Sequence, residues 1–165
     1  MKKTILSTLC FLLVSCFMFF TDAGTRIVVL GSSTAAGAGV SDSNRAWVNQ
    51  YRTYLQSIDP TNTVTNLAKG GYTTCAIMPT GTDPYDTGNH ILEVDTERNI
   101  TKALSLSPNA IIINMPTNDV SNGIPVATQM KHFATIIDLA KAAGVKVWIT
   151  TSQPVSYTHL RAHET

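Results

Sequence analysis

The sequence has 165 residues, of which 44% are hydrophobic and 14% are charged, and its formal net charge is +1. This composition is typical of one soluble globular domain and excludes a collagen-like or intrinsically disordered chain. A nearly neutral chain without a basic stripe also argues against nucleic acid or another polyanion as its partner.

The first 23 residues resemble a secretory signal peptide. Two lysines precede an apolar stretch over 5–20, and residues 21–23 supply the cleavage positions. The apolar stretch is short for a membrane span, so we expect cleavage near Ala23 and a secreted or periplasmic protein. As the alternative, residues 13–16 resemble a bacterial lipoprotein signal, in which a lipid on Cys16 would anchor the protein at the cell envelope.

Cysteine and the C-terminal tail carry no predicted chemistry. Outside the signal, Cys75 stands alone, so no disulfide framework is expected, and we interpret it as a small core residue. The last eleven residues, VSYTHLRAHET at 155–165, resemble the translation of a transposase adapter used to prepare sequencing libraries. We therefore take 24–154 as the domain and give His159 and His163 no role.

Short β-branched runs alternate with helical patterns between 24 and 154. The predicted strands are 26–30, 64–67, 110–114 and 145–150, and the predicted helices are 46–58, 99–106 and 126–143. We expect Asn44 to cap the first helix and Gly144 to end the last. Apolar strands that alternate with helices predict a three-layer α/β/α fold with a parallel, flavodoxin-like sheet.

Short polar motifs follow the first three strands, at the edge of the sheet where parallel strands place a site. They are GSS at 31–33, AKGGYT at 68–73 and PTND at 116–119. Each alone is an ordinary turn or helix cap. The first motif lacks the lysine and the glycine spacing of a nucleotide-binding loop. The polar region 72–98 is predicted to be a long connection that contacts the substrate.

Together the three motifs resemble the blocks of the SGNH (GDSL-type) serine esterase family. VVLGSSTAAG is similar to the first block, which implies that Ser33 is the nucleophile. NLAKGGYTT is similar to the second, with Gly71 preferred to Gly70 as a backbone donor, and NMPTNDV to the third, with Asn118 as a side-chain donor. The N–H groups of Ser33 and Gly71 and the Asn118 amide would then stabilise an oxyanion, at about 3 kcal/mol for one donor.

The sequence departs from the family pattern in three ways. Ser32 replaces the usual aspartate and Pro116 the usual glycine. The family's Asp-x-x-His block, which supplies the base, does not occur in 24–154. We assign neither His90 nor His132 to that role, and we expect His132 to lie on the flank of a helix. We expect the last strand and helix of the fold to be missing as well. The chain as given would then be inactive, with 145–150 as an aggregation-prone sheet edge.

The resemblance implies a hydrolase of carboxylic esters that needs neither metal nor cofactor. Export and the threonine-rich loops at the predicted site edge of the sheet favour an acetylated polysaccharide as the substrate. The alternatives are a lipid-acyl esterase or thioesterase and, from a different class, a catalytically inactive module that binds glycan.

Overall fold

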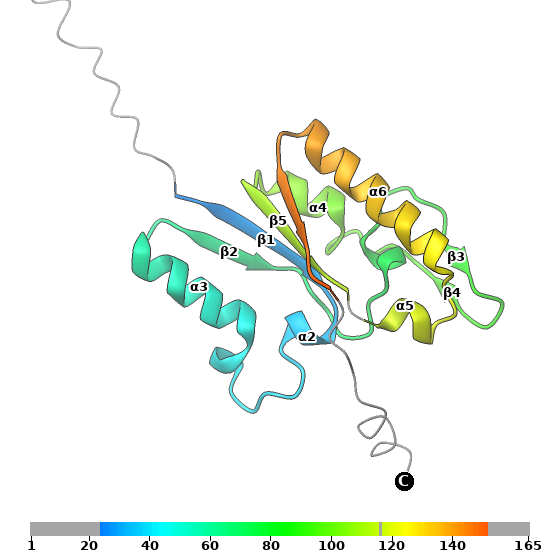
Figure 1. Cartoon of the computed structure of the whole chain (residues 1–165), viewed down its shortest axis with the longest axis horizontal. Helices are drawn as coiled ribbons and strands as arrows, with labels where there is room; N and C mark the ends of the chain where they lie inside the picture. The colour runs from blue at the N-terminus through cyan, green and yellow to red at the C-terminus, as the bar shows by residue number, and fades with distance from the viewer. Residues whose placement is uncertain (1–23, 116, 152–165) are drawn as a thin grey trace, which may run out of the picture.

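A four-stranded parallel sheet forms the centre of the described part of the chain (Figure 1). The structure is a computed structural model that describes residues 24–115 and 117–151. The strands, in sheet order, are β2 (Thr63–Asn66), β1 (Arg26–Gly31), β5 (Ala110–Asn114) and β6 (Lys146–Ile149). All three pairings are parallel, as the alternation of strands and helices predicted.

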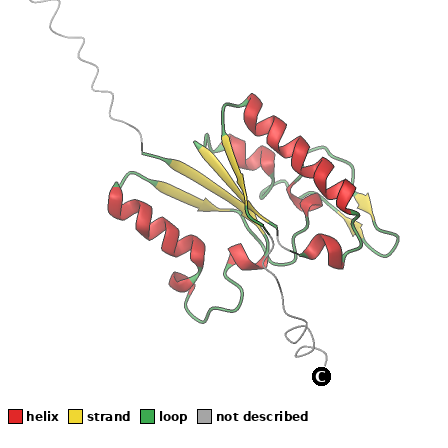
Figure 2. Cartoon of the chain, in the orientation of Figure 1, coloured by secondary structure: helices red, strands yellow, loops and turns green. Residues whose placement is uncertain are grey.

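Helices cover both faces of this sheet (Figure 2). The helix α3 (Trp47–Ile58) packs on one face, and α4 (Ile100–Ser105) and α6 (Val126–Ala142) cover the other. Alternate residues of β1 serve the two layers: Val28 and Leu30 join the α4 and α6 side, whereas Ile27 and Val29 join the α3 side. The three-layer α/β/α prediction is therefore confirmed.

Burial on both faces explains why the central strands are continuously apolar. Val28 pairs with Ile111 and Leu30 with Ile113, and all four side chains are buried. Each such side chain contributes about 1.5–3 kcal/mol when it is fully removed from water. This rigid core fixes the positions of the loops that follow β1 and β5.

The helix ends agree with the sequence at one position and not at another. Gly144 follows α6 with a φ of +72°, and its N–H donates to the carbonyl of Lys141, so this stop signal is confirmed. The expected cap at Asn44 is wrong. A 3₁₀ turn, η1 (Ser43–Arg45), occupies that position, with the side chain of Asp42 accepting from the N–H of Asn44 at 2.9 Å.

The region 72–98 is more structured than a plain connection. It contains the 3₁₀ helix η2 (Thr74–Ile77) and a short hairpin of β3 (Tyr85–Asp86) and β4 (Ile91–Leu92). The residues of η2 are buried, and Cys75 is only 3% exposed. This burial confirms the interpretation of Cys75 as a core residue, and it also raises the pKa of the thiol.

Strand β6 is an edge of the sheet in the described part of the chain, as expected. It pairs with β5 alone, and Trp148 on it is 49% exposed. No helix within 24–115 and 117–151 is long and apolar enough to cross a membrane. The predicted signal, Pro116 and the tail at 155–165 lie outside the described residues.

Candidate active site

The two serines after β1 differ in accessibility. Ser32 is 1% exposed, and its N–H donates to the carbonyl of Asn114 at 3.1 Å. Ser33 is the first residue of the short helix α2 (Ser33–Ala36) and is only half-buried. Gly31 permits this sharp turn, since a Cβ there would lie 2.6 Å from the Cβ of Ala35. Of the two hydroxyls, Ser33 offers the one that a substrate can reach.

The glycine loop after β2 lies next to this serine. The N–H of Lys69 donates to the carbonyl of Gly31 at 3.1 Å, which ties the loop to the end of β1. A Cβ built on Gly70 would lie 4.0 Å from the Cβ of Ser33. Gly71 has a φ of +82°, a left-handed conformation that favours glycine, and open space around its Cα.

The third motif meets the second through a side-chain hydrogen bond. Asn118 is the first residue of α5 (Asn118–Ser121), and its Nδ2 donates to the carbonyl of Tyr72 at 2.8 Å. An amide nitrogen carries two hydrogens, so one remains available to a developing oxyanion. The structure therefore brings together the segments of Ser33, Gly71 and Asn118 at the carboxyl ends of β1, β2 and β5.

A polar cluster that the sequence did not indicate braces the outer side of the glycine loop. The hydroxyl of Tyr72 donates to Asp95, and Lys69 Nζ lies 4.0 Å from the same carboxylate and 5.6 Å from the Tyr72 ring centroid. Burial and the bond to Asp95 raise the pKa of Tyr72, whereas that bond lowers the pKa of Asp95. At neutral pH the phenol is therefore the donor and the carboxylate the acceptor.

A second unexpected network lies behind Asn118. Asp119 accepts from the N–H of Thr74 at 3.0 Å and also from the Thr74 hydroxyl, and the hydroxyl oxygen lies 2.8 Å from His132 Nδ1. His132 is half-buried, and this burial lowers its pKa, an effect partly opposed by the charge of Asp119. The partners lie 45 and 58 positions apart, so no local sequence signal could have revealed them.

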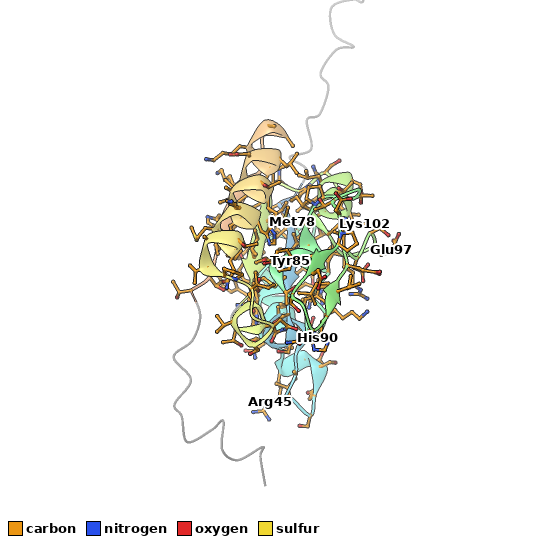
Figure 3. All side chains as sticks on the ribbon, turned by 90° about the vertical axis from the view of Figure 1, so that its right-hand side faces the viewer. Arg45, Met78, Tyr85, His90, Glu97 and Lys102 are labelled. Atoms are coloured by element: carbon orange, nitrogen blue, oxygen red, sulfur yellow. The ribbon has the colours of Figure 1, made fainter. Side chains whose placement is uncertain are left out.

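Among the described residues, neither His90 nor His132 bonds to Ser33. His90 belongs to the turn of the hairpin, where its carbonyl accepts from Thr87 at 3.0 Å, and His132 bonds to Thr74. Figure 3 looks onto this side, with Tyr85 and His90 labelled. No hydrogen bond among the described residues joins Ser33 to a histidine, and no group of three or more His, Cys, Asp or Glu there could hold a metal ion.

Two pockets lie at the carboxyl ends of the strands, beside these motifs. The smaller has a volume of about 290 Å³, and its lining consists of Thr34, Trp47, Asn114, Thr150 and Thr151. The larger, about 480 Å³, has a mainly apolar lining that includes Met115, Val120, Met130, Phe133, Ile137 and Ile149. Thr150 and Thr151 line both, so the two pockets adjoin each other at the end of β6.

Solved structures of esterases share the fold. TesA aligns with a TM-score of 0.61 at 20% identity over 85% of this chain and 67% of its own. AlinE4, an SGNH-hydrolase family esterase, aligns with a TM-score of 0.58 at 18% identity over 79% of this chain and 61% of its own. A two-domain esterase active on acetylated mannans, co-crystallised with mannopentaose, aligns with a TM-score of 0.54 at 18% identity. This alignment covers 76% of this chain and 30% of that esterase.

The chain thus spans about two thirds or less of the length of these structural relatives. None of the curated proteins compared with the chain matches it. The model of the GDSL-like lipase/acylhydrolase family, however, matches residues 29–164. The chain therefore belongs to the GDSL-like lipase/acylhydrolase family of hydrolases that act on ester bonds.

Proposed function

We propose that this chain is the N-terminal part of a secreted serine esterase in which Ser33 is the nucleophile. The observation that carries the proposal is the hydrogen bond from Asn118 to Tyr72, at 2.8 Å, next to a glycine loop that lies against Ser33. Three motifs separated in the sequence thereby come together at the edge of the sheet that carries this reachable hydroxyl. Acyl transfer needs such a nucleophile next to oxyanion donors.

In the proposed reaction, Ser33 Oγ attacks the ester carbonyl while a base removes its proton. The backbone N–H groups of Ser33 and Gly71 and the second Nδ2 hydrogen of Asn118 stabilise the oxyanion that forms. The C–O bond to the alcohol then breaks, the alcohol leaves with the proton, and water hydrolyses the acyl-serine in a second, equivalent cycle. One oxyanion donor contributes about 3 kcal/mol of barrier lowering.

The base in this proposal is a histidine of an Asp-x-x-His segment that follows Pro154 in the complete protein. The 165-residue chain would then lack a base, because 155–165 resembles an adapter and His90 and His132 bond elsewhere. Loss of the base from a serine triad lowers kcat on the order of a million-fold. We therefore expect negligible turnover from the 165-residue chain itself.

An acetyl ester of a carbohydrate is the substrate class that we propose. The pocket next to Thr34 has a volume of about 290 Å³, small enough to favour a short acyl group. Trp47 offers an aromatic surface there, and the exposed Thr34 and Thr151 offer hydroxyl groups that can bind sugar hydroxyls. The activity of one structural relative on acetylated mannans agrees with this choice.

The larger pocket favours a second candidate, an esterase or thioesterase for lipid-acyl groups. Its lining of Met115, Met130 and Phe133 is apolar, and Val120 on the helix of Asn118 contributes to it. A linear acyl chain attached at Ser33 would gain about 0.8 kcal/mol for each methylene buried in such a groove. The two candidates therefore predict opposite dependences on acyl-chain length.

The first experiment is to sequence the source DNA past the codon for Pro154 and to express the complete reading frame. Hydrolysis of p-nitrophenyl esters of increasing chain length and of acetylated mannan would be compared for the wild type and for Ser33→Ala, with Ser43→Ala as the matched control. Loss of turnover in Ser33→Ala alone, with preference for acetyl esters, supports the proposal.

Other outcomes separate the alternatives. Preference for long chains would favour the lipid-acyl candidate. An absent Asp-x-x-His segment, together with glycan binding but no Ser33-dependent turnover, would favour a glycan-binding module. Mass spectrometry of the mature N-terminus would distinguish secretion with a start near Gly24 from a lipoprotein with modified Cys16.

A further inference from the structure

Asp119 makes contacts that reach beyond its own short helix. Its carboxylate accepts the N–H of Thr74 through both oxygens, at 3.0 and 3.1 Å, and accepts the Thr74 hydroxyl as well. Thr74 is 0% exposed and Asp119 4% exposed. Removing either partner would leave a buried polar group unsatisfied, so this contact strongly holds η2 against α5.

The direction of the hydroxyl bond determines how His132 joins the network. The single hydrogen of the Thr74 hydroxyl points to Asp119, so the oxygen can only accept from His132 Nδ1, 2.8 Å away. His132 therefore carries its hydrogen on Nδ1. Its ring also packs edge-on against Tyr85, with centroids 6.2 Å apart, so the 17-residue helix α6 supports the network.

We propose that Asp119, Thr74 and His132 form a clamp that positions the oxyanion donors, an inference that rests on the proposed esterase function. Asn118 and Asp119 are adjacent and hold Tyr72 and Thr74 respectively. The donor Gly71 directly precedes the segment held in this way. The helix α5 has only four residues and no side-chain N-cap, so these contacts orient the Asn118 amide.

The clamp touches no reacting atom, so its residues are positioning residues. Oxyanion donors act on the transition state more than on the bound substrate, so a misplaced donor lowers kcat and leaves KM unchanged. A purely structural role would instead lower the folded fraction, with no such selectivity. Displacements of about 1 Å at a catalytic group cost up to about a hundredfold in rate.

The test measures kcat and KM for p-nitrophenyl acetate with the protein encoded by the complete reading frame. Thr74→Val keeps the backbone N–H and the shape but removes the hydroxyl, and we expect kcat to fall about tenfold to a hundredfold at constant KM. Thr74→Ser restores the hydroxyl and should recover most of the rate. Thr80→Val is the matched control, since it removes a threonine hydroxyl that bonds to Asn99 at 2.9 Å.

A second variant keeps the proposal falsifiable should Thr74→Val fold poorly. His132→Phe retains a ring against Tyr85 but removes the Nδ1–H donor, and we expect kcat to fall about threefold to tenfold at constant KM, less than for Thr74→Val because the Asp119 contact survives. Equal losses of kcat in the clamp variants and in Thr80→Val, or a change in KM alone, would contradict the proposed clamp. No Ser33-dependent turnover in the wild type would instead overturn the proposed function, and the catalytic role of the clamp with it.

Discussion

Replacing Ser32 by alanine should stabilise the protein, although the residue is next to Ser33, the proposed nucleophile. Ser32 is 1% exposed, and its Oγ has no hydrogen-bond partner among the described residues. It precedes α2 at the N-cap position, yet its side chain makes no capping bond. The hydroxyl therefore loses its water on folding and gains no bond in return from residues 24–115 and 117–151.

The expected gain is the difference between two opposing free energies. An unsatisfied buried hydroxyl costs about 1–3 kcal/mol. Removing one oxygen leaves a void of about 15 Å³, which at about 24 cal/mol per Å³ costs about 0.4 kcal/mol. The free energy of unfolding of Ser32→Ala should thus rise by about 1–2 kcal/mol, and its Tm by about 3–6 °C.

Urea and thermal unfolding, followed by circular dichroism, would measure this change. The control is Ser105→Ala, whose exposed hydroxyl donates to the carbonyl of Lys102 at 2.7 Å and whose stability should stay within about 0.5 kcal/mol of the wild type. Ser33-dependent turnover of the complete protein should persist in Ser32→Ala. Unchanged or lower stability of Ser32→Ala would refute the reasoning, because it would mean that the hydroxyl has a partner.

Three further measurements test other features. Burial lowers the pKa of His132 below 6.5, so on acidification the unfolded chain binds the extra proton first. The contribution of His132 to the free energy of unfolding should therefore be complete above about pH 6.5 and decrease as the pH falls. Urea titrations at several pH values would measure this decrease, which should be smaller in His132→Gln. Trp148→Lys should slow aggregation of the 165-residue chain in light scattering, since Trp148 is 49% exposed on the edge strand β6. Unchanged aggregation would mean that this strand edge does not cause the aggregation. Gly71→Ala should lower the free energy of unfolding by about 1 kcal/mol because of its φ of +82°. Gly70→Ala should leave stability nearly unchanged, since its Cβ would lie at an ordinary contact distance, 4.0 Å, from the Cβ of Ser33; the reverse order of stabilities would contradict this reasoning.

Several features were readable from the sequence because their signals are local. Apolar runs such as 110–114 predicted buried parallel strands, and Gly144 marked the end of a helix. The motifs around Ser33, Gly71 and Asn118 pointed to the family that the family model identifies. The apolar runs and the helix end are local, so periodicity and stop signals were sufficient for them, whereas the family was indicated by the resemblance of the three motifs taken together.

Other features depended on contacts between distant segments. The mispredicted cap at Asn44 is the exception, because Asp42, only two positions earlier, accepts its N–H and turns the chain before α3 begins. The burial of Ser32 follows from Asn114, and the contact of Asp119 with Thr74 spans 45 positions. A hydrogen-bond partner so far along the chain leaves no pattern in either segment. The sequence by itself therefore determined the α/β layers and the candidate residues, whereas only the tertiary structure decided which serine is reachable and which contacts hold the segments of Gly71 and Asn118.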